Sequence, residues 1–147
     1  MPSEAIQRTI LVDNLPPVVD FNSFTEASNQ HAQHAIGSTM WYNPAQSGGF
    51  FVNIDATDLG SGVNRVDYPT LNGLTGSGWT PVSTFSDPTL PYSALMTWDL
   101  GATDPGSITV TGYDNAGNSD TASFTVHPDF TPPSGQTISY QDGFTND

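Results

Sequence analysis

Apolar and polar residues alternate along the stretch from Ser107 to Val126, and a polar connector interrupts the pattern once. The apolar positions are Ile108, Val110 and Gly112 before the connector and Ala122, Phe124 and Val126 after it. Alternation with a period of two predicts half-buried β-strands. The connector, YDNAGNSD, is rich in residues that form tight turns. We therefore expect a β-hairpin with polar oxygen atoms crowded at its tip.

Shorter apolar and aromatic runs predict further strands before this hairpin. These runs are Val18 to Phe21, Thr39 to Tyr42, Gly49 to Asp55, Val63 to Tyr68, Trp79 to Phe85 and Tyr92 to Leu100. Residues Asn22 to Ser38 fit either a short helical turn or a loop. About seven strands with turns at this spacing are typical of an all-β sandwich. The side chains expected in the core are Phe50, Val52, Ile54, Leu95, Trp98 and Trp41, whereas Asp55 should face the other side of its strand.

Composition narrows the partners and the chemistry. The chain has 147 residues and a formal net charge of −13, with Arg8 and Arg65 as its only strongly basic residues. This charge argues against binding to nucleic acid or an anionic membrane, and favours bound cations or a salty medium. The chain contains no cysteine, so neither a disulfide nor a thiolate metal site can form. No apolar run is long enough to span a membrane.

Two similar passages suggest a long-period internal repeat. Arg8 to Val12 runs into Asp13, two further residues and Pro-Pro, and the strand that ends at Val126 is followed by Asp129, two residues and Pro-Pro. Paired prolines stiffen the chain and suit a joint between domains. We therefore predict the last strand and linker of a preceding repeat in residues 1–14, a complete domain in residues 15–128, and a linker and the start of a following repeat in residues 129–147. Two ordinary proline-rich loops remain the alternative.

Two loop motifs carry a resemblance to a known family. DATDLGSGV at residues 55–63 and GYDNAGN at residues 112–118, together with the Pro-Pro joint, resemble bacterial immunoglobulin-like repeat modules. Such modules occur in tandem in large secreted or surface-anchored proteins, including adhesins. The resemblance covers roughly Leu15 to Val126. It implies an immunoglobulin-like β-sandwich with Greek-key connections, a location outside the cell or on its surface, and a structural or adhesive role without catalysis.

The same fold would bring several oxygen-bearing side chains to one end of the domain. In such a sandwich the connector between the second and third strands, the final hairpin tip and the entering linker share one end. The residues concerned are Asp13, Asn14, Asp55, Asp58, Asp114, Asn115 and Asn118. Carboxylates, amides and carbonyls are the ligands of Ca2+, and carboxylates this close would need a compensating cation or protons. We therefore predict a Ca2+ site that stiffens the junction between repeats. Turn formation by the same residues explains them without a metal.

Other chemistries receive less support from the sequence. His31 and His34 would share a helix face and bind a transition metal, or would be solvent-exposed loop residues. Glu4 and Glu26 are the only glutamates, and nothing marks a catalytic carboxylate pair. No GxSxG nucleophile motif occurs, and without lysine no Lys–Asn isopeptide bond can form. We expect no enzymatic activity.

The function expected from these observations is that of a spacer or stalk in an extracellular, adhesin-like protein. Its partners would be neighbouring repeats of the same chain or other copies, with a surface glycan or protein as a ligand. A carbohydrate-binding module is one alternative, because Trp79 follows a glycine-rich turn and could project toward a sugar ring. A filament joined by strand exchange is another, because Arg8 to Val12 and Gln136 to Tyr140 would expose unpaired strand edges.

Overall fold

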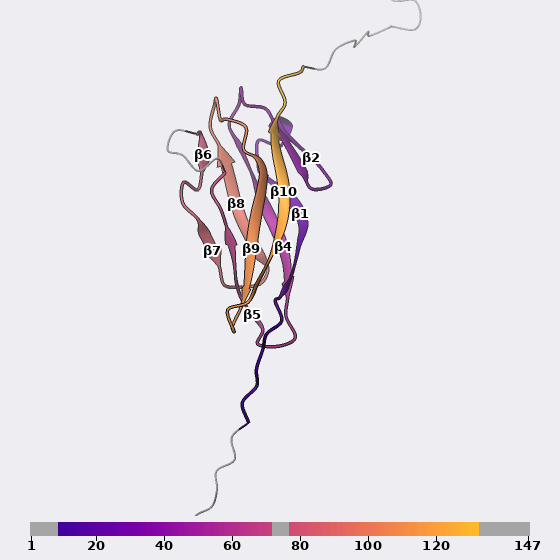
Figure 1. The fold of residues 1–147 in the computed structure, drawn as a ribbon. Coiled ribbons are helices and arrows are strands. Elements are labelled where there is room, and N and C mark those ends of the chain that lie inside the picture. The colour runs from indigo at the N-terminus through magenta and orange to yellow at the C-terminus, as the bar shows by residue number, and fades with distance from the viewer. Residues whose placement is uncertain (1–8, 72–76, 133–147) are drawn as a thin grey trace, which may run out of the picture.

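A computed structural model describes residues 9–71 and 77–132 of the chain (Figure 1). The described residues form ten strands and one 3-10 helix. The elements are β1 (Val18–Ser28), η1 (Gln30–Ala32), β2 (Gln33–Ile36), β3 (Thr39–Tyr42), β4 (Gly48–Thr57), β5 (Val63–Tyr68), β6 (Trp79–Thr80), β7 (Phe85–Asp87), β8 (Tyr92–Trp98), β9 (Gly106–Asp114) and β10 (Ser119–Pro128). Two sheets pack face to face, so the domain is an immunoglobulin-like β-sandwich, as predicted. The strand not expected from the sequence is β2, and the expected run from Trp79 to Phe85 gives two short strands, β6 and β7.

The last strand lies in the middle of the larger sheet. The order in that sheet is β2-β3-β10-β9-β5-β7, and in the smaller sheet it is β1-β4-β8-β6. The predicted hairpin is present, and β10 pairs with β9 in antiparallel register from Ser119 opposite Tyr113 to Val126 opposite Gly106. On its other edge β10 pairs in parallel with β3, from Thr125 opposite Thr39 to Pro128 opposite Tyr42. The chain therefore leaves the domain from a strand that is held on both sides.

The region left open by the sequence, residues 22–38, contains the second half of β1, the short helical turn η1 that was one of the two expectations, and β2 in the other sheet. β1 runs on to Ser28, and its pairing with β4 shifts register between Phe21 and Ser23. The extra residue, Asn22, is a β-bulge. Because the bulge moves the alternation by one position, both Phe21 and Phe24 face the core, and their ring centroids lie 4.7 Å apart. The bulge is the reason that period-two alternation stops predicting this strand after Phe21.

Aromatic side chains fill the space between the sheets and fix nearby loops. The rings of Tyr42, Trp79 and Trp98 are mutual neighbours, with centroids 4.9 to 5.8 Å apart. Their polar atoms donate to loop carbonyls: Trp98 Nε1 to Gln46 O at 2.8 Å, Trp79 Nε1 to Thr103 O at 2.8 Å and Tyr42 Oη to Ala102 O at 2.9 Å. A buried ring with a satisfied polar group is stable in a core. The predicted core positions Phe50, Val52, Ile54 and Trp98 are confirmed.

Several sequence expectations are wrong in detail. Trp41, expected in the core, keeps 38% of its surface exposed, whereas Trp79, whose environment the sequence left open, is buried. Leu95 was also expected in the core but is 44% exposed, because it alternates with the buried Ala94 and Met96 along β8. The expected strand from Trp79 to Phe85 is divided into β6 and β7, which belong to different sheets.

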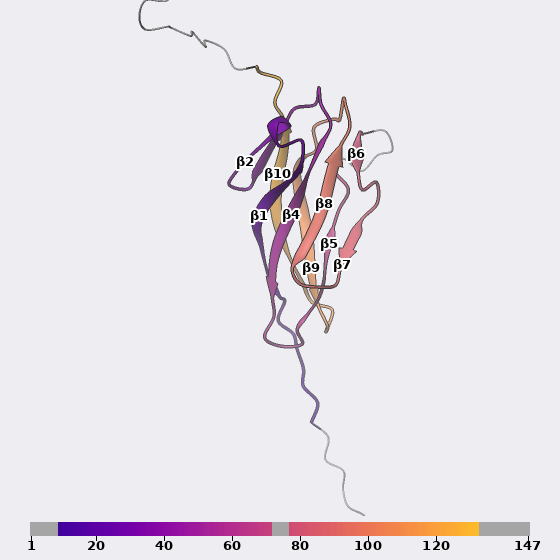
Figure 2. The ribbon, with the colours of Figure 1, turned by 180° about the vertical axis from the view of Figure 1, so that it is seen from behind.

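The loops gather at two opposite ends of the sandwich (Figures 1 and 2). The chain enters at one end, called the entry end, where linker residues 13–17 meet the β4–β5 loop (residues 58–62) and the β9–β10 turn (residues 115–118). It leaves at the other end, the exit end, beside η1 and the loops after β3 and β8. The described part of the expected strand from Arg8 to Val12 has no strand partner, and its apolar residues are exposed. Arg8 and the segment from Gln136 to Tyr140 lie outside the described residues.

No helix in the described ranges is long and apolar enough to cross a membrane.

The alternation along β8 predicts unequal costs for truncating two adjacent residues. Met96→Ala removes a fully buried side chain and should lower the free energy of unfolding by about 2–5 kcal/mol. Leu95→Ala removes an exposed one and should cost less than about 1 kcal/mol. Urea denaturation of both variants measures the difference. Equal losses, or a larger loss for Leu95→Ala, would contradict the assigned faces of β8.

Candidate metal centre

Three carboxylates from three separate segments meet at the entry end. Asp13 comes from the linker, Asp58 from the start of the β4–β5 loop and Asp114 from the end of β9. One carboxylate oxygen from each lies within 4.8 Å of the others. These three residues form the group that we call the Asp trio. All three were predicted from the sequence as metal ligands, and the structure brings them together.

The two loop carboxylates are fixed by the turns in which they lie. Asp58 Oδ2 accepts a hydrogen bond from Gly62 N at 2.6 Å, and Gly62 has a φ of +83°, which favours glycine. Asp114 Oδ1 accepts from Ala116 N at 2.9 Å and from Asn118 N at 2.8 Å. Asp114 is only 3% exposed. The turn residues expected from the sequence therefore do form turns, and the turns aim the carboxylates at one place.

The linker carboxylate is held by the β4–β5 loop. Asp13 Oδ2 accepts from Ser61 N at 2.6 Å, and its Oδ1 accepts from Leu15 N at 3.2 Å. Gly60 lies directly against the Asp13 carboxylate, so a Cβ at this position would collide with it. Ser61 and Gly60 were not predicted as site residues. The glycine-rich sequence LGSG was the available signal, because such loops expose backbone N–H groups to an anion.

Two of the predicted asparagines act as braces around the Asp trio. The Asn118 side-chain amide donates to Asp114 Oδ2 at 2.7 Å and to Leu15 O at 3.2 Å, which ties the hairpin tip to the linker. The Asn115 amide donates to Ser61 O at 2.9 Å and to Gly62 O at 3.0 Å, which ties the same tip to the β4–β5 loop. Both amides therefore position the carboxylates by linking three segments.

Of the two remaining predicted ligands, Asp55 lies apart from the Asp trio, and Asn14 follows Asp13 in the linker. Asp55 is exposed on β4, and its Oδ2 accepts from Asn22 Nδ2 at 2.7 Å. Its side chain points away from the core, as the alternation predicted, and it does not join Asp58 although only two residues separate them. Asn14 is exposed in the linker and does not belong to the carboxylate group.

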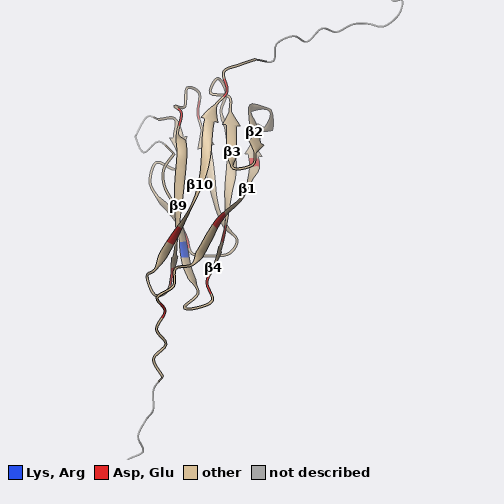
Figure 3. Cartoon of the chain, turned by 45° about the vertical axis from the view of Figure 1, so that its right-hand side comes forward, with Lys and Arg blue, Asp and Glu red and all other residues tan. Residues whose placement is uncertain are grey.

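No basic side chain from the described residues compensates the charge of the Asp trio. Acidic residues lie along the length of the domain (Figure 3), whereas Arg65 is the only described lysine or arginine. Its Nε lies 3.0 Å from Asp67 Oδ1, and its guanidinium lies over the ring of Tyr113 at 4.1 Å. Oxygen ligands with uncompensated charge are suited to a hard cation such as Ca2+, which takes six to eight oxygens. The Asp trio would supply three of these oxygens.

The histidines and glutamates form no comparable group. In the described ranges, the only cluster of at least three potential metal-ligating side chains is the Asp trio. His31 and His34 are exposed on η1 and β2, and His127 Nδ1 lies 3.1 Å from Asp104 Oδ1 at the exit end. Glu26 is half-buried on β1, and Glu4 lies outside the described residues.

Comparison with known proteins adds a limited likeness. Neither the protein-family models nor the curated proteins give a match. Among solved structures, the chain is similar to fibronectin(III)-like modules of Clostridium thermocellum CbhA, with 17% identity and a TM-score of 0.44. The alignment covers 89% of this chain and 55% of that one, so the chain spans about half the length of the structure it matches.

The hydrogen bonds to Asp13 predict its titration. Ser61, and then the backbone of Leu15, lower the pKa of the Asp13 carboxyl below its usual 3.8. Because these bonds exist only in the folded protein, Asp13 adds stability above pH 3.8, and this contribution is lost as the pH falls through the lower folded pKa. The amide resonance of Ser61 should shift with a midpoint below 3.8 in an NMR titration.

Asp13→Asn should abolish this titration of the Ser61 amide, whereas Asp55→Asn should leave it in place. A midpoint at or above 3.8 would show that Ser61 does not stabilise the charged carboxylate.

Proposed function

We propose that the chain is a non-catalytic structural module of the bacterial immunoglobulin-like repeat type. It would serve as a spacer or stalk in an extracellular, adhesin-like protein and would stand in a tandem array. Entry and exit at opposite ends of an elongated sandwich support this role, because modules joined in this way extend instead of folding back (Figure 1). In this proposal, residues 1–14 and 129–147 belong to the joints with neighbouring modules and residues 15–128 form the complete domain.

The observation that carries the proposal is the position of Asp13. A linker carboxylate that meets two carboxylates of the domain gives a cation the means to fix the linker to the domain. Ca2+ bound to the Asp trio would replace repulsion by attraction between the three segments. The joint would then resist bending, which is the property that a stalk requires. The uncompensated charge of the Asp trio supports a cation of this kind.

The two alternatives differ in the support they receive. A carbohydrate-binding module was suggested by the aromatic residues of the chain; Trp79 and Trp98 are buried, so Trp41 is the one tryptophan exposed for stacking on a sugar. Strand exchange with another copy is favoured by one observation, the exposure of Ile10, Leu11 and Val12. Size-exclusion chromatography over a range of concentrations tests it, because a strand-exchanged filament grows with concentration whereas a single module stays a monomer.

A metal-dependent melt tests the proposed joint. The thermal midpoint should rise in Ca2+ relative to EDTA, because a ligand that binds only the folded state stabilises it by mass action. At about 100 times the Kd the gain is about 2.7 kcal/mol. For a domain of this size that corresponds to a shift of roughly 5–15 °C. Mg2+ should give a smaller rise, because it demands a smaller, regular octahedral site.

Matched variants separate a specific site from general charge screening. Asp58→Asn should abolish the Ca2+-dependent rise, whereas Asp55→Asn, which removes the same charge three residues earlier in the chain, should keep it. An equal rise in NaCl alone, or an equal Ca2+ response in both variants, would refute the metal joint. The Asp trio would then serve turn formation only.

A further inference from the structure

The Asp-x-x-Pro-Pro sequence occurs where the chain enters the domain and again where it leaves. The two aspartates make the same local hydrogen bond. Asp13 Oδ1 accepts from Leu15 N at 3.2 Å, and Asp129 Oδ1 accepts from Thr131 N at 2.8 Å. The two segments are therefore alike in backbone turn as well as in sequence.

The second oxygen of each aspartate distinguishes the two ends. Asp13 Oδ2 accepts from Ser61 N of the β4–β5 loop. Asp129 uses only Oδ1 in the hydrogen bonds of the described residues, and its Oδ2 is left without a donor. The exit segment thus has the same turn as the entry segment, but in the part of the chain that the structure describes no β4–β5 loop lies beside it to donate a hydrogen bond to the second carboxylate oxygen.

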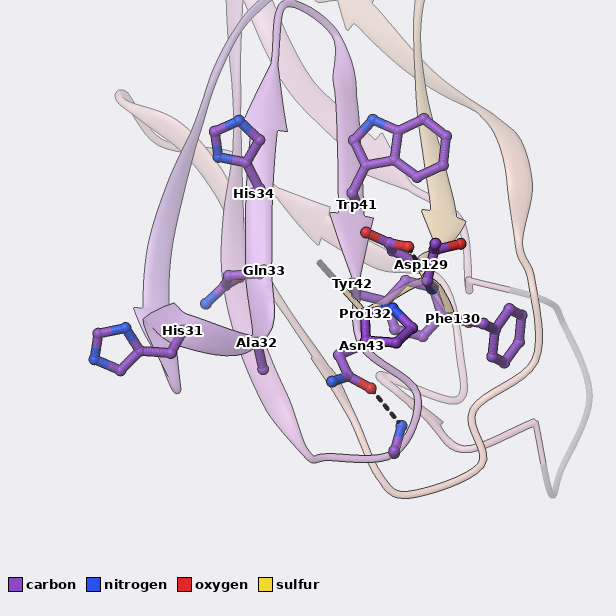
Figure 4. Close-up of a pocket in the computed structure, with 12 residues that line it drawn as sticks. His31, Ala32, Gln33, His34, Trp41, Tyr42, Asn43, Asp129, Phe130 and Pro132 are labelled. Carbon is purple, nitrogen blue, oxygen red and sulfur yellow. Dashed lines mark hydrogen bonds between the residues drawn. The ribbon is translucent and has the colours of Figure 1, made fainter. Parts of the chain in front are cut away.

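A groove of about 550 Å³ lies beside Asp129 at the exit end (Figure 4). Its lining includes Trp41, Tyr42, Asn43, Asp129, Phe130 and Pro132. Figure 4 shows Asp129 between the side chains of Trp41 and Phe130, both of which are exposed. Trp41 also packs on the ring of His127, with centroids 5.5 Å apart. The groove combines the exposed rings of Trp41 and Phe130 with polar residues that include His31 and His34, and it is suited to a partner that inserts an apolar side chain.

We infer that this groove receives the β4–β5 loop of a following copy of the domain, with Leu59 as the inserted side chain. The inference rests on the proposed tandem array. If Asp129 takes the place of Asp13 for the next copy, the Ser61 N–H of that copy meets Asp129 Oδ2. Leu59 of that copy then lies two residues from the Asp129 contact, at the mouth of the groove.

The exposed side chains of the entry end support this pairing. Leu59 is fully exposed at the loop tip, next to Gly60, which touches Asp13. Ile10, Leu11 and Val12 are also exposed, whereas the equivalent residues before Asp129 are Val126 to Pro128, which pair with β3 and include the buried Val126. A preceding copy would therefore cover both Leu59, with its groove, and Ile10 to Val12, with its β3.

A two-copy chain tests the inference by tryptophan fluorescence. Residues 1–132 are joined directly to residues 17–147, so that Asp129 and its exit segment replace the second copy's linker. Trp79 and Trp98 are buried, so acrylamide quenching reports mainly on Trp41. With Trp41→Phe in the second copy, the only exposed tryptophan left is Trp41 in the groove of the first copy, so the quenching of this residue reports whether the groove is covered. The quenching constant of this groove should fall roughly twofold relative to the single chain, because a packed interface excludes solvent.

The same substitution in either copy supplies the control. Leu59→Asp in the second copy should restore quenching to the single-chain value, whereas Leu59→Asp in the first copy, whose loop has no groove before it, should change nothing. A melt of each variant checks folding, and Leu59→Ser repeats the test with an uncharged side chain.

Two outcomes would overturn the inference: quenching equal to that of the single chain, or equal effects of Leu59→Asp in both copies. In one case the single chain responds to Ca2+ while Trp41 of the two-copy chain is quenched as strongly as in the single chain. That result would refute the contact between Leu59 and the groove and would leave the proposed Ca2+-stiffened module in place.

Discussion

The packing of Tyr42, Trp79 and Trp98 between the sheets is the interaction on which the exit end of the domain depends. Each ring is buried, and each directs its one polar atom to a loop carbonyl. Leaving such a donor unpaired inside a core is costly, so the loops must stay where their carbonyls meet the rings. Tyr42 belongs to β3, which pairs with β10, and its neighbour in β3, Trp41, lines the groove at the exit end.

The sequence predicted the strands whose alternation is unbroken and failed where another constraint intervened. The β9–β10 hairpin and the inward face of β4 follow directly from a period of two. The bulge at Asn22 shifts the phase of β1, and no propensity marks its position. Trp41 was expected in the core and is exposed, and Trp79, which the sequence left open, is buried. Size favours burial for both rings, and only the sheet register decides which of them faces inward.

The candidate site was predictable to the extent that it depends on turns. Asp58 and Asp114 begin tight turns at one end of any sandwich of this connectivity, and the linker before β1 enters at that end. Asp55 was grouped with them because it is close in sequence, but a strand position places its side chain on the outer face of β4. The contribution of Ser61 could not be predicted from side-chain chemistry, because the donor is its backbone N–H group.

The pairing of β10 with β3 has a mechanical consequence. The two strands run parallel, and the chain leaves the domain at the end of β10, beyond its last hydrogen bonds with β3. Tension applied between the entry and exit ends acts along these strands, so it loads the hydrogen bonds of the pair together and does not open them one at a time. The neighbouring antiparallel strand β9 shares that load over eight paired positions. Such a domain unfolds under tension only when the hydrogen bonds of β10 with both β3 and β9 break together.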